Sequence, residues 1–202
     1  MMLRAHPSDG FSYIELLVCT AIILILYALY LGPSSAAGQA KRKAECAQHL
    51  QQMHLSLALY AQEHNGTFPV RTDASSSEQP LSLLVPQYTS DTSVFICPAG
   101  RQAKLPEAQV FDNRRISYSY YMGVRADAGP SVPLVSDAQV DTTTVRPIGT
   151  PLFAEKRSAT GGNHVQYGGN VLFADGHVES FPNRVTRDLD ASAGVKLLNP
   201  KP

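Results

Sequence analysis

The sequence predicts an α+β protein in which a long N-terminal helix, first transmembrane and then soluble, packs on a small antiparallel β-sheet. Three observations predict this fold: an apolar run over residues 11–31, an apolar stripe at helical spacing over 46–60, and apolar segments on both sides of an Asp-Gly turn at 175–176. The 202 residues are enough for one domain of about 150 residues and an appendage. Lys+Arg and Asp+Glu are both 17, so the net charge gives no sign of a nucleic-acid partner.

The apolar run over 11–31 is interrupted by one charge, Glu15. As a helix it would be about 31 Å long, close to the thickness of the bilayer hydrocarbon. A secretory signal peptide is one alternative, but the apolar part of a signal peptide is about 7–15 residues long and follows a basic start, which is nearly missing here. A plain anchor is another alternative, but it does not explain Glu15, because an acidic residue inside a spanning helix usually has a partner.

Cleavage between Gly10 and Phe11 would create a partner for Glu15. The new α-amino group of Phe11 would lie about one helical turn from the Glu15 carboxylate. The two charges could then neutralise each other, within one chain or between staggered neighbouring chains. Such a pair would set the register of a helix bundle.

The stretch GFSYIELLV, residues 10–18, resembles the processing site of type IV pilins and type II secretion pseudopilins. The resemblance implies a pilin-like fold, cleavage after Gly10 by a prepilin peptidase and methylation of the new N-terminal Phe11. It also implies that Glu15 guides addition of the subunit to a helical filament of other pilin-like subunits. The leader MMLRAHPSDG departs from the family, which generally has more Lys and Arg there.

Beyond Pro33 the sequence predicts that the helix continues and then meets a sheet. Cys46, Leu50, Met53, Leu57 and Tyr60 recur at helical spacing, and Asn65–Gly66 predicts a left-handed stop. The expected organisation is a leader over 1–10, a transmembrane or filament-core helix over 11–32, its amphipathic continuation over 33–66, an α/β head over 67–182 and a loosely ordered tail over 183–202.

Short strands are expected at 93–97, 114–124, 132–138 and 150–156, the last two carrying Asp137 and Glu155 near their ends. A hairpin is expected over 171–181, with Asp175–Gly176 as a two-residue type I′ turn. In that register Val178 shares the core face with Val171 and Phe173.

The three cysteines are too few for a disulfide scaffold. Cys19 lies inside the apolar run, which leaves Cys46 and Cys97. These two either form a disulfide in an oxidising compartment or remain two buried free thiols.

The segments 46–69, 95–100, 117–123 and 163–178 resemble prepilin-type proteins that carry a C-terminal His–spacer–Asp–Gly motif. The motif residues would be His164, Asp175 and Gly176, followed by His177. The spacer is one residue longer than usual. Either the loop holds an insertion, or His164 does not occupy the family position.

No cofactor and no catalytic site are predicted. The turn accounts for Asp175 and Gly176 without a metal, and the catalytic and phosphate-binding motifs are missing, so we expect no enzyme. A transition metal held by His164, His177 and nearby carboxylates is one candidate, but it would need two or more histidines and carboxylates that converge. Calcium is the better candidate, because related pseudopilins bind it in a C-terminal loop. The candidate ligands here are Asp137, Glu155 and Asp175, although no dense Asp/Asn loop surrounds them.

The function expected from the sequence is a pseudopilin or minor pilin of a type II secretion or type IV pilus-like filament. Such a protein is a single-pass protein of the bacterial inner membrane, with its head in the periplasm or at the cell surface. Its partners would be the prepilin peptidase, other pilin-like subunits and the membrane, and no nucleic acid. The alternative is a membrane-tethered exported module that binds a ligand or calcium and does not polymerise.

Overall fold

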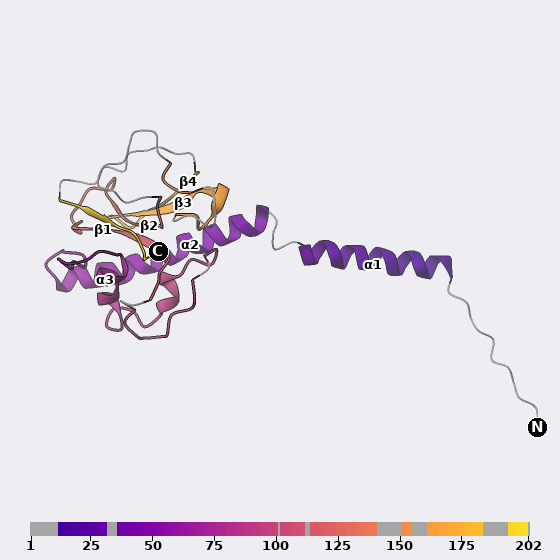
Figure 1. Ribbon diagram of the computed structural model, residues 1–202, viewed down its shortest axis with the longest axis horizontal. Helices are drawn as coiled ribbons and strands as arrows, with labels where there is room; N and C mark the ends of the chain where they lie inside the picture. Colours follow the sequence, from indigo (N-terminus) through magenta and orange to yellow (C-terminus); the bar gives the residue numbers. More distant parts are fainter. Residues whose placement is uncertain are drawn as a thin grey trace, which may run out of the picture. The chain divides into compact units, whose positions relative to one another are not determined.

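The computed structural model describes residues 12–31, 36–100, 102–111, 114–140, 151–154, 161–183 and 194–201, with the side chains of the first helix described as far as Leu29. Over these residues the fold is α+β, with three α-helices and a five-stranded antiparallel sheet (Figure 1). The α+β class expected from the sequence is thereby confirmed, and the pilin-like arrangement with one long N-terminal helix stays a prediction. The chain divides into two units, Met1–Gly38 and Gln39–Pro202.

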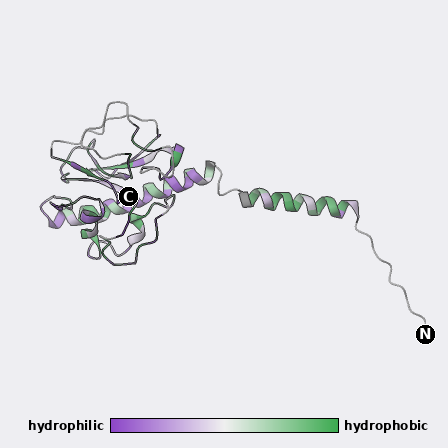
Figure 2. Cartoon of the chain, in the orientation of Figure 1, coloured by the Kyte–Doolittle hydropathy of each residue, from purple (hydrophilic) through white to green (hydrophobic). Residues whose placement is uncertain are grey.

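Helix α1, Tyr13–Leu31, belongs to the first unit. It contains no Gly or Pro, and its apolar side chains are exposed on every side of the helix (Figure 2). Glu15 lies in the first turn, where a carboxylate interacts favourably with the positive end of the helix dipole. Within the described part of the chain, no helix is both long and apolar enough to cross a membrane. The transmembrane helix over 11–32 stays a prediction.

Helix α2, Ala36–Glu63, supplies one wall of the core. The predicted stripe is confirmed, because Cys46, Leu50, Met53 and Leu57 are fully buried. The stop also lies where it was expected: Asn65 and Gly66 have φ values of 54° and 73°, and the Gly66 N–H donates to the carbonyl oxygen of Ala61 at 2.8 Å. The helix predicted over 11–66 is thus described as two elements, α1 and α2.

The sheet has the strand order β4-β3-β2-β1-β5, and every neighbouring pair is antiparallel. One apolar core joins the buried stripe of α2, the sheet and the segment over 68–111, which includes the short helices α3 (Glu78–Leu81), η2 (Ser82–Leu84) and η3 (Thr92–Phe95). A smaller cluster formed by Leu152, Phe153, Val171, Phe173 and Phe181 is separate from it. The strands are β1 Tyr118–Met122, β2 Pro133–Asp137, β3 Gly169–Phe173, β4 Val178–Phe181 and β5 Lys196–Leu198.

Two of the predicted strands are wrong. Residues 93–97 mostly form η3, because the Asp91 side chain accepts a hydrogen bond from the Ser93 N–H at 2.9 Å and caps a helical turn there. Residues 151–154 are not a strand, although Leu152 and Phe153 are buried. Among the residues that the structure describes, their backbone makes two single hydrogen bonds and no ladder: the Val140 N–H donates to the carbonyl oxygen of Leu152, and the Ala154 N–H donates to that of Gly161, both at 3.0 Å.

The hairpin over 171–181 exists, but its register differs by one residue from the prediction. Leu172 pairs with Val178, and the Phe173 N–H donates to the carbonyl oxygen of His177, so the loop has three residues instead of two. Gly176 takes a φ of 94°, which suits the last position of a three-residue loop. Val178 therefore lies with Leu172 against the main core, not with Val171 and Phe173.

The tail also differs from the prediction of a loosely ordered segment. Its described part, residues 194–201, contains β5, which pairs with β1. Leu198 is buried, and Lys196 Nζ donates to the carbonyl oxygen of Ala74 at 2.7 Å. Burial of Leu198 and these hydrogen bonds outweigh the entropy of ordering a chain end.

Candidate functional site

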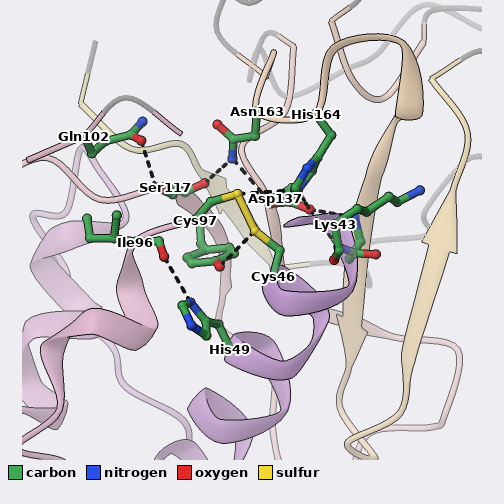
Figure 3. Close-up of a disulfide and its surroundings, with 12 residues drawn as sticks. Lys43, Cys46, His49, Ile96, Cys97, Gln102, Ser117, Asp137, Asn163 and His164 are labelled. Carbon is green, nitrogen blue, oxygen red and sulfur yellow. Dashed lines mark hydrogen bonds and ion pairs between the residues drawn. A yellow bond between two sulfur atoms is a disulfide. The ribbon is translucent and has the colours of Figure 1, made fainter. Parts of the chain in front are cut away.

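Four chemically reactive side chains meet in the interior of the head: Cys46, Cys97, Asp137 and His164 (Figure 3). All four residues are buried, and one sulfur, nitrogen or oxygen atom from each lies within 4.8 Å of those of the others. We call this group the buried cluster. Such polar groups are rarely placed in a protein core without bonding partners.

The buried cluster draws on four separate parts of the fold. Cys46 belongs to the buried stripe of α2, and Cys97 is the second residue after η3. Asp137 is the last residue of β2, and His164 precedes η4, Val165–Tyr167. Gly168 follows η4 with a φ of 76°, and a Cβ there would overlap the carbonyl oxygen of Phe181, so only glycine lets the chain return into β3 at this point.

The two cysteines form a disulfide across 51 residues of sequence, with their Cα atoms 5.4 Å apart. Of the two alternatives left open by the sequence, the structure has the disulfide. The Tyr118 hydroxyl donates to Cys46 Sγ at 3.4 Å. Burial raises the pKa of Tyr118 well above its ordinary value, and the negative charge of Asp137 raises it further, so the hydroxyl remains a donor.

Asp137 is surrounded by donors. Its Oδ2 accepts from the Asn170 backbone N–H at 2.8 Å and from Asn170 Nδ2 at 3.2 Å, and its Oδ1 lies 3.4 Å from Asn163 Nδ2. His164 Nε2 lies 3.3 Å from Oδ2. The carboxylate is therefore fully engaged, as a buried charge must be.

Lys43 is the nearby cation. Its ammonium donates to the carbonyl oxygens of Tyr167 at 2.7 Å and Phe181 at 3.1 Å. Burial lowers the pKa of Lys43, and the negative charge of Asp137 partly offsets this effect. The positive charge therefore interacts with the Asp137 carboxylate although the two groups have separate hydrogen-bond partners.

His164 has contacts on one side of its ring. Nε2 lies 3.5 Å from Cys97 Sγ in addition to its contact with Asp137. The other ring nitrogen, Nδ1, is buried and has no hydrogen-bond partner among the described residues.

The remaining residues of the predicted motif lie elsewhere. Asp175 and His177 are exposed in the loop between β3 and β4, where Asp175 Oδ1 accepts from the His177 N–H at 3.1 Å and contacts its ring Nδ1 at 2.6 Å. Slight burial acts to raise the pKa of Asp175, but the hydrogen bonds from His177 outweigh it and lower that pKa. A Cβ on Gly176 would lie 2.7 Å from the ring of His54, so this loop needs glycine. The structure does not make His164 and Asp175 partners.

The predicted calcium ligands are not assembled into one site within the described residues. Asp137 is buried among asparagine amides, whereas Asp175 is exposed and bonded to His177. Glu155 lies outside the described residues, as do Gly10 and Phe11 of the predicted processing site. Glu15 is described, and it is exposed on the first turn of α1.

Sequence reasoning singled out all four members of the buried cluster but did not group them. It missed Asn163, Asn170 and Lys43. No local pattern marks these three residues, because their roles depend on contacts with residues far away in the chain, such as Asn170 Nδ2 with the carbonyl oxygen of Lys43 at 3.0 Å.

No protein-family model matches this chain, and no curated protein or solved structure matches it either.

Proposed function

We propose that this chain is a prepilin-type subunit, a pseudopilin or minor pilin, that is cleaved after Gly10, methylated at Phe11 and assembled into a type II secretion or type IV pilus-like filament. The observation that carries the proposal is Glu15. It is the one charged residue between Tyr13 and Leu31, and it follows a Gly–Phe junction by less than two helical turns.

The surface of α1 supports this proposal. The helix is apolar all round, and residues such as Leu17, Ile23 and Leu29 are more than 60% exposed (Figure 2). A helix with no polar face is stable only when other apolar material surrounds it. Lipid before assembly and the packed helices of a filament core after assembly would both supply that material.

The Glu15 carboxylate supports the proposal in a second way. It has no hydrogen-bond or ion-pair partner among the described residues. An unpaired carboxylate in lipid costs a few kcal/mol, and the α-amino group that cleavage creates at Phe11 of a neighbouring subunit would remove that cost. Assembly would therefore stabilise the subunit, and the charge pair would set its register.

The disulfide between Cys46 and Cys97 agrees with a head outside the cytosol. Disulfides persist in oxidising compartments such as the bacterial periplasm and are rare in reducing ones. This agrees with a single-pass protein of the inner membrane whose head is exported.

The processing step can be tested by mass spectrometry of the mature N-terminus from cells that express a prepilin peptidase. We expect a chain that begins with N-methylated Phe11. A mature chain that still begins at Met1, or one that begins near Lys41 as after signal-peptide cleavage, would contradict the proposal.

The assembly step can be tested with Glu15→Ala. We expect this variant to insert into the membrane and to be processed, but to be lost from sheared filaments. Thr20→Ala is the matched control, because Thr20 is also a polar residue of α1 and its hydroxyl donates within the helix, to the carbonyl oxygen of Leu17 at 2.9 Å. If both variants enter filaments equally well, Glu15 has no role in assembly. If the wild type enters none, the tethered binding module becomes the better explanation.

A further inference from the structure

The buried cluster has the composition of a zinc site. It offers two cysteine sulfurs, one imidazole nitrogen and one carboxylate oxygen, all within 4.8 Å of one another and all shielded from water. Structural zinc sites take four ligands of these three types in a tetrahedral arrangement. The four ligands here come from four elements, so a metal would join α2, the segment after η3, the end of β2 and the residue before η4.

We propose that the dithiol form of this protein binds one Zn²⁺ ion through Cys46 Sγ, Cys97 Sγ, Asp137 Oδ2 and His164 Nε2. The proposal does not rest on the proposed filament function. It assigns to the buried cluster a second state, which alternates with the disulfide.

The distances on the nitrogen and oxygen side already suit a tetrahedron. With metal–ligand bonds of about 2.0 Å to nitrogen and oxygen and about 2.3 Å to sulfur, neighbouring ligands lie about 3.3 to 3.8 Å apart. His164 Nε2 is 3.3 Å from Asp137 Oδ2 and 3.5 Å from Cys97 Sγ. The two bonded sulfurs must separate, and reduction of their bond permits that.

A thiol or dithiol reductant supplies two electrons, the Cys46–Cys97 S–S bond breaks, and two protons complete the two thiols while the reductant becomes a disulfide. Zn²⁺ then displaces both thiol protons and binds the two thiolates. In the reverse direction a disulfide oxidant accepts two electrons from the two thiolates and is itself reduced to two thiols, taking up two protons from water; the Cys46–Cys97 S–S bond re-forms and the ion is released. The disulfide and the zinc site therefore exclude each other.

The surroundings of the cluster fit an occupied site. The Asp137 carboxylate is fixed by Asn170 and Asn163, and the Tyr118 hydroxyl contacts Cys46 Sγ, so two ligands have outer partners that hold their position. Two thiolates, one carboxylate and Zn²⁺ sum to a charge of −1, and the Lys43 ammonium nearby carries +1. The buried charge is therefore balanced overall.

The donor set also selects the metal. Calcium takes six to eight oxygen ligands, whereas the cluster offers one carboxylate. Thiolate and imidazole ligands in a tetrahedral arrangement favour zinc among the common divalent ions. His164 Nδ1 has no hydrogen-bond partner among the described residues. This does not distinguish the disulfide from the zinc site, because both use only the other ring nitrogen, Nε2.

The experiment uses the full-length chain in detergent. One sample is left oxidised, and the other is reduced without oxygen, stripped of metal with a chelator and desalted. Each is titrated with Zn²⁺ in competition with a chromophoric chelator, and Co²⁺ is then used as a spectroscopic probe. We expect one Zn²⁺ per reduced chain, none per oxidised chain, and a cobalt spectrum with thiolate charge-transfer and tetrahedral ligand-field bands.

Substitutions test the two ligands that are not cysteine. Loss of an outer-shell partner weakens metal binding by about tenfold. Asp137→Asn and His164→Gln remove direct ligands, so each should weaken zinc binding by more than that. The matched controls are Asp175→Asn and His177→Gln, which change the exposed His–Asp contact in the β3–β4 loop and should leave affinity and stoichiometry unchanged. Circular dichroism of each oxidised variant shows that its head is folded before reduction.

Three results would overturn the proposal: a reduced wild type that binds no stoichiometric zinc, zinc binding that is equal in the oxidised and reduced chains, or unchanged affinity in both Asp137→Asn and His164→Gln. Because the oxidised and reduced wild types are compared directly, the sulfur requirement is tested even if a cysteine variant fails to fold.

Discussion

Asp137 connects more of the head than any other single residue of the buried cluster. Its carboxylate accepts hydrogen bonds from Asn170 on β3 and lies against Asn163 and His164 in the segment that leads into η4. A buried carboxylate needs such donors, and removal of any of them would leave part of its hydrogen-bonding capacity unsatisfied. The same preorganised oxygen is what makes it suitable as a metal ligand.

At the surface, Tyr88 and Glu63 form a bond whose pH dependence can be measured. The Tyr88 hydroxyl donates to Glu63 Oε2 at 2.7 Å, and this hydrogen bond, with some burial and the charge of Glu63, raises the pKa of Tyr88 to about 12. The ordinary value is 10.0. Because the folded-state pKa is raised, the bond stabilises the fold fully below about pH 10, and this contribution is lost as the pH rises towards about 12.

Glu63→Gln should therefore move one tyrosine ionisation to lower pH in a spectrophotometric titration of the folded chain. Glu107→Gln is the control, because it removes an exposed carboxylate for which no contact with a tyrosine is described. Identical titration curves for the wild type and Glu63→Gln would show that the bond does not form in solution.

At the scale of elements, the sequence predicted the helices and strands whose formation depends on residues close together in the chain. The apolar stripe of α2 and its stop at Asn65–Gly66 follow from spacing and backbone preference alone, and both are present. β1 and β2 also lie within the predicted ranges. Apolar composition did not distinguish a strand from a helical turn at 92–95, because the decisive interaction is the capping bond from Asp91.

Long-range pairing was less predictable. The hairpin register depends on whether the loop holds two or three residues, and both lengths are compatible with an Asp–Gly pair. β5 was missed because three residues near a chain end carry little periodic signal, although their partner is β1. The grouping of the buried cluster was not predicted because it depends on long-range contacts. Asp137 and His164 meet only because β2 and the segment before η4 are neighbours in the fold.

The position of β5 gives a prediction about the C-terminal segment. Leu198 pairs with Tyr120 and is 2% exposed, so Leu198→Ala should destabilise the head by about 2–5 kcal/mol through lost burial and the cavity left behind. Leu59→Ala is the matched control, because Leu59 is 52% exposed on α2 and should cost far less. Urea unfolding followed by circular dichroism measures both, and equal midpoints would mean that β5 does not pack on β1.

At the scale of the whole molecule, the division into two units determines what the disulfide can stabilise. Cys46 and Cys97 both belong to Gln39–Pro202, whereas α1 belongs to Met1–Gly38. The crosslink restricts the unfolded chain over 51 residues, which on the loop-entropy model is worth about 4 kcal/mol. That is a large share of the about 5–15 kcal/mol that stabilises a typical domain.

The test is to reduce the full-length chain in detergent, with a chelator present so that no zinc site can form. Reduction should lower the urea midpoint of the head by the equivalent of about 4 kcal/mol and leave the helicity of α1 unchanged. Cys19→Ser should behave as the wild type before and after reduction, because Cys19 is free and exposed on α1. Cys97→Ser should resemble the reduced wild type even without reductant.

If reduction leaves the midpoint in place, no crosslink joins α2 to the segment after η3. If it also melts α1, the two units depend on each other for stability. Recovery of the midpoint when the chelator is replaced by Zn²⁺ would show that a metal bridge can take over the role of the covalent one.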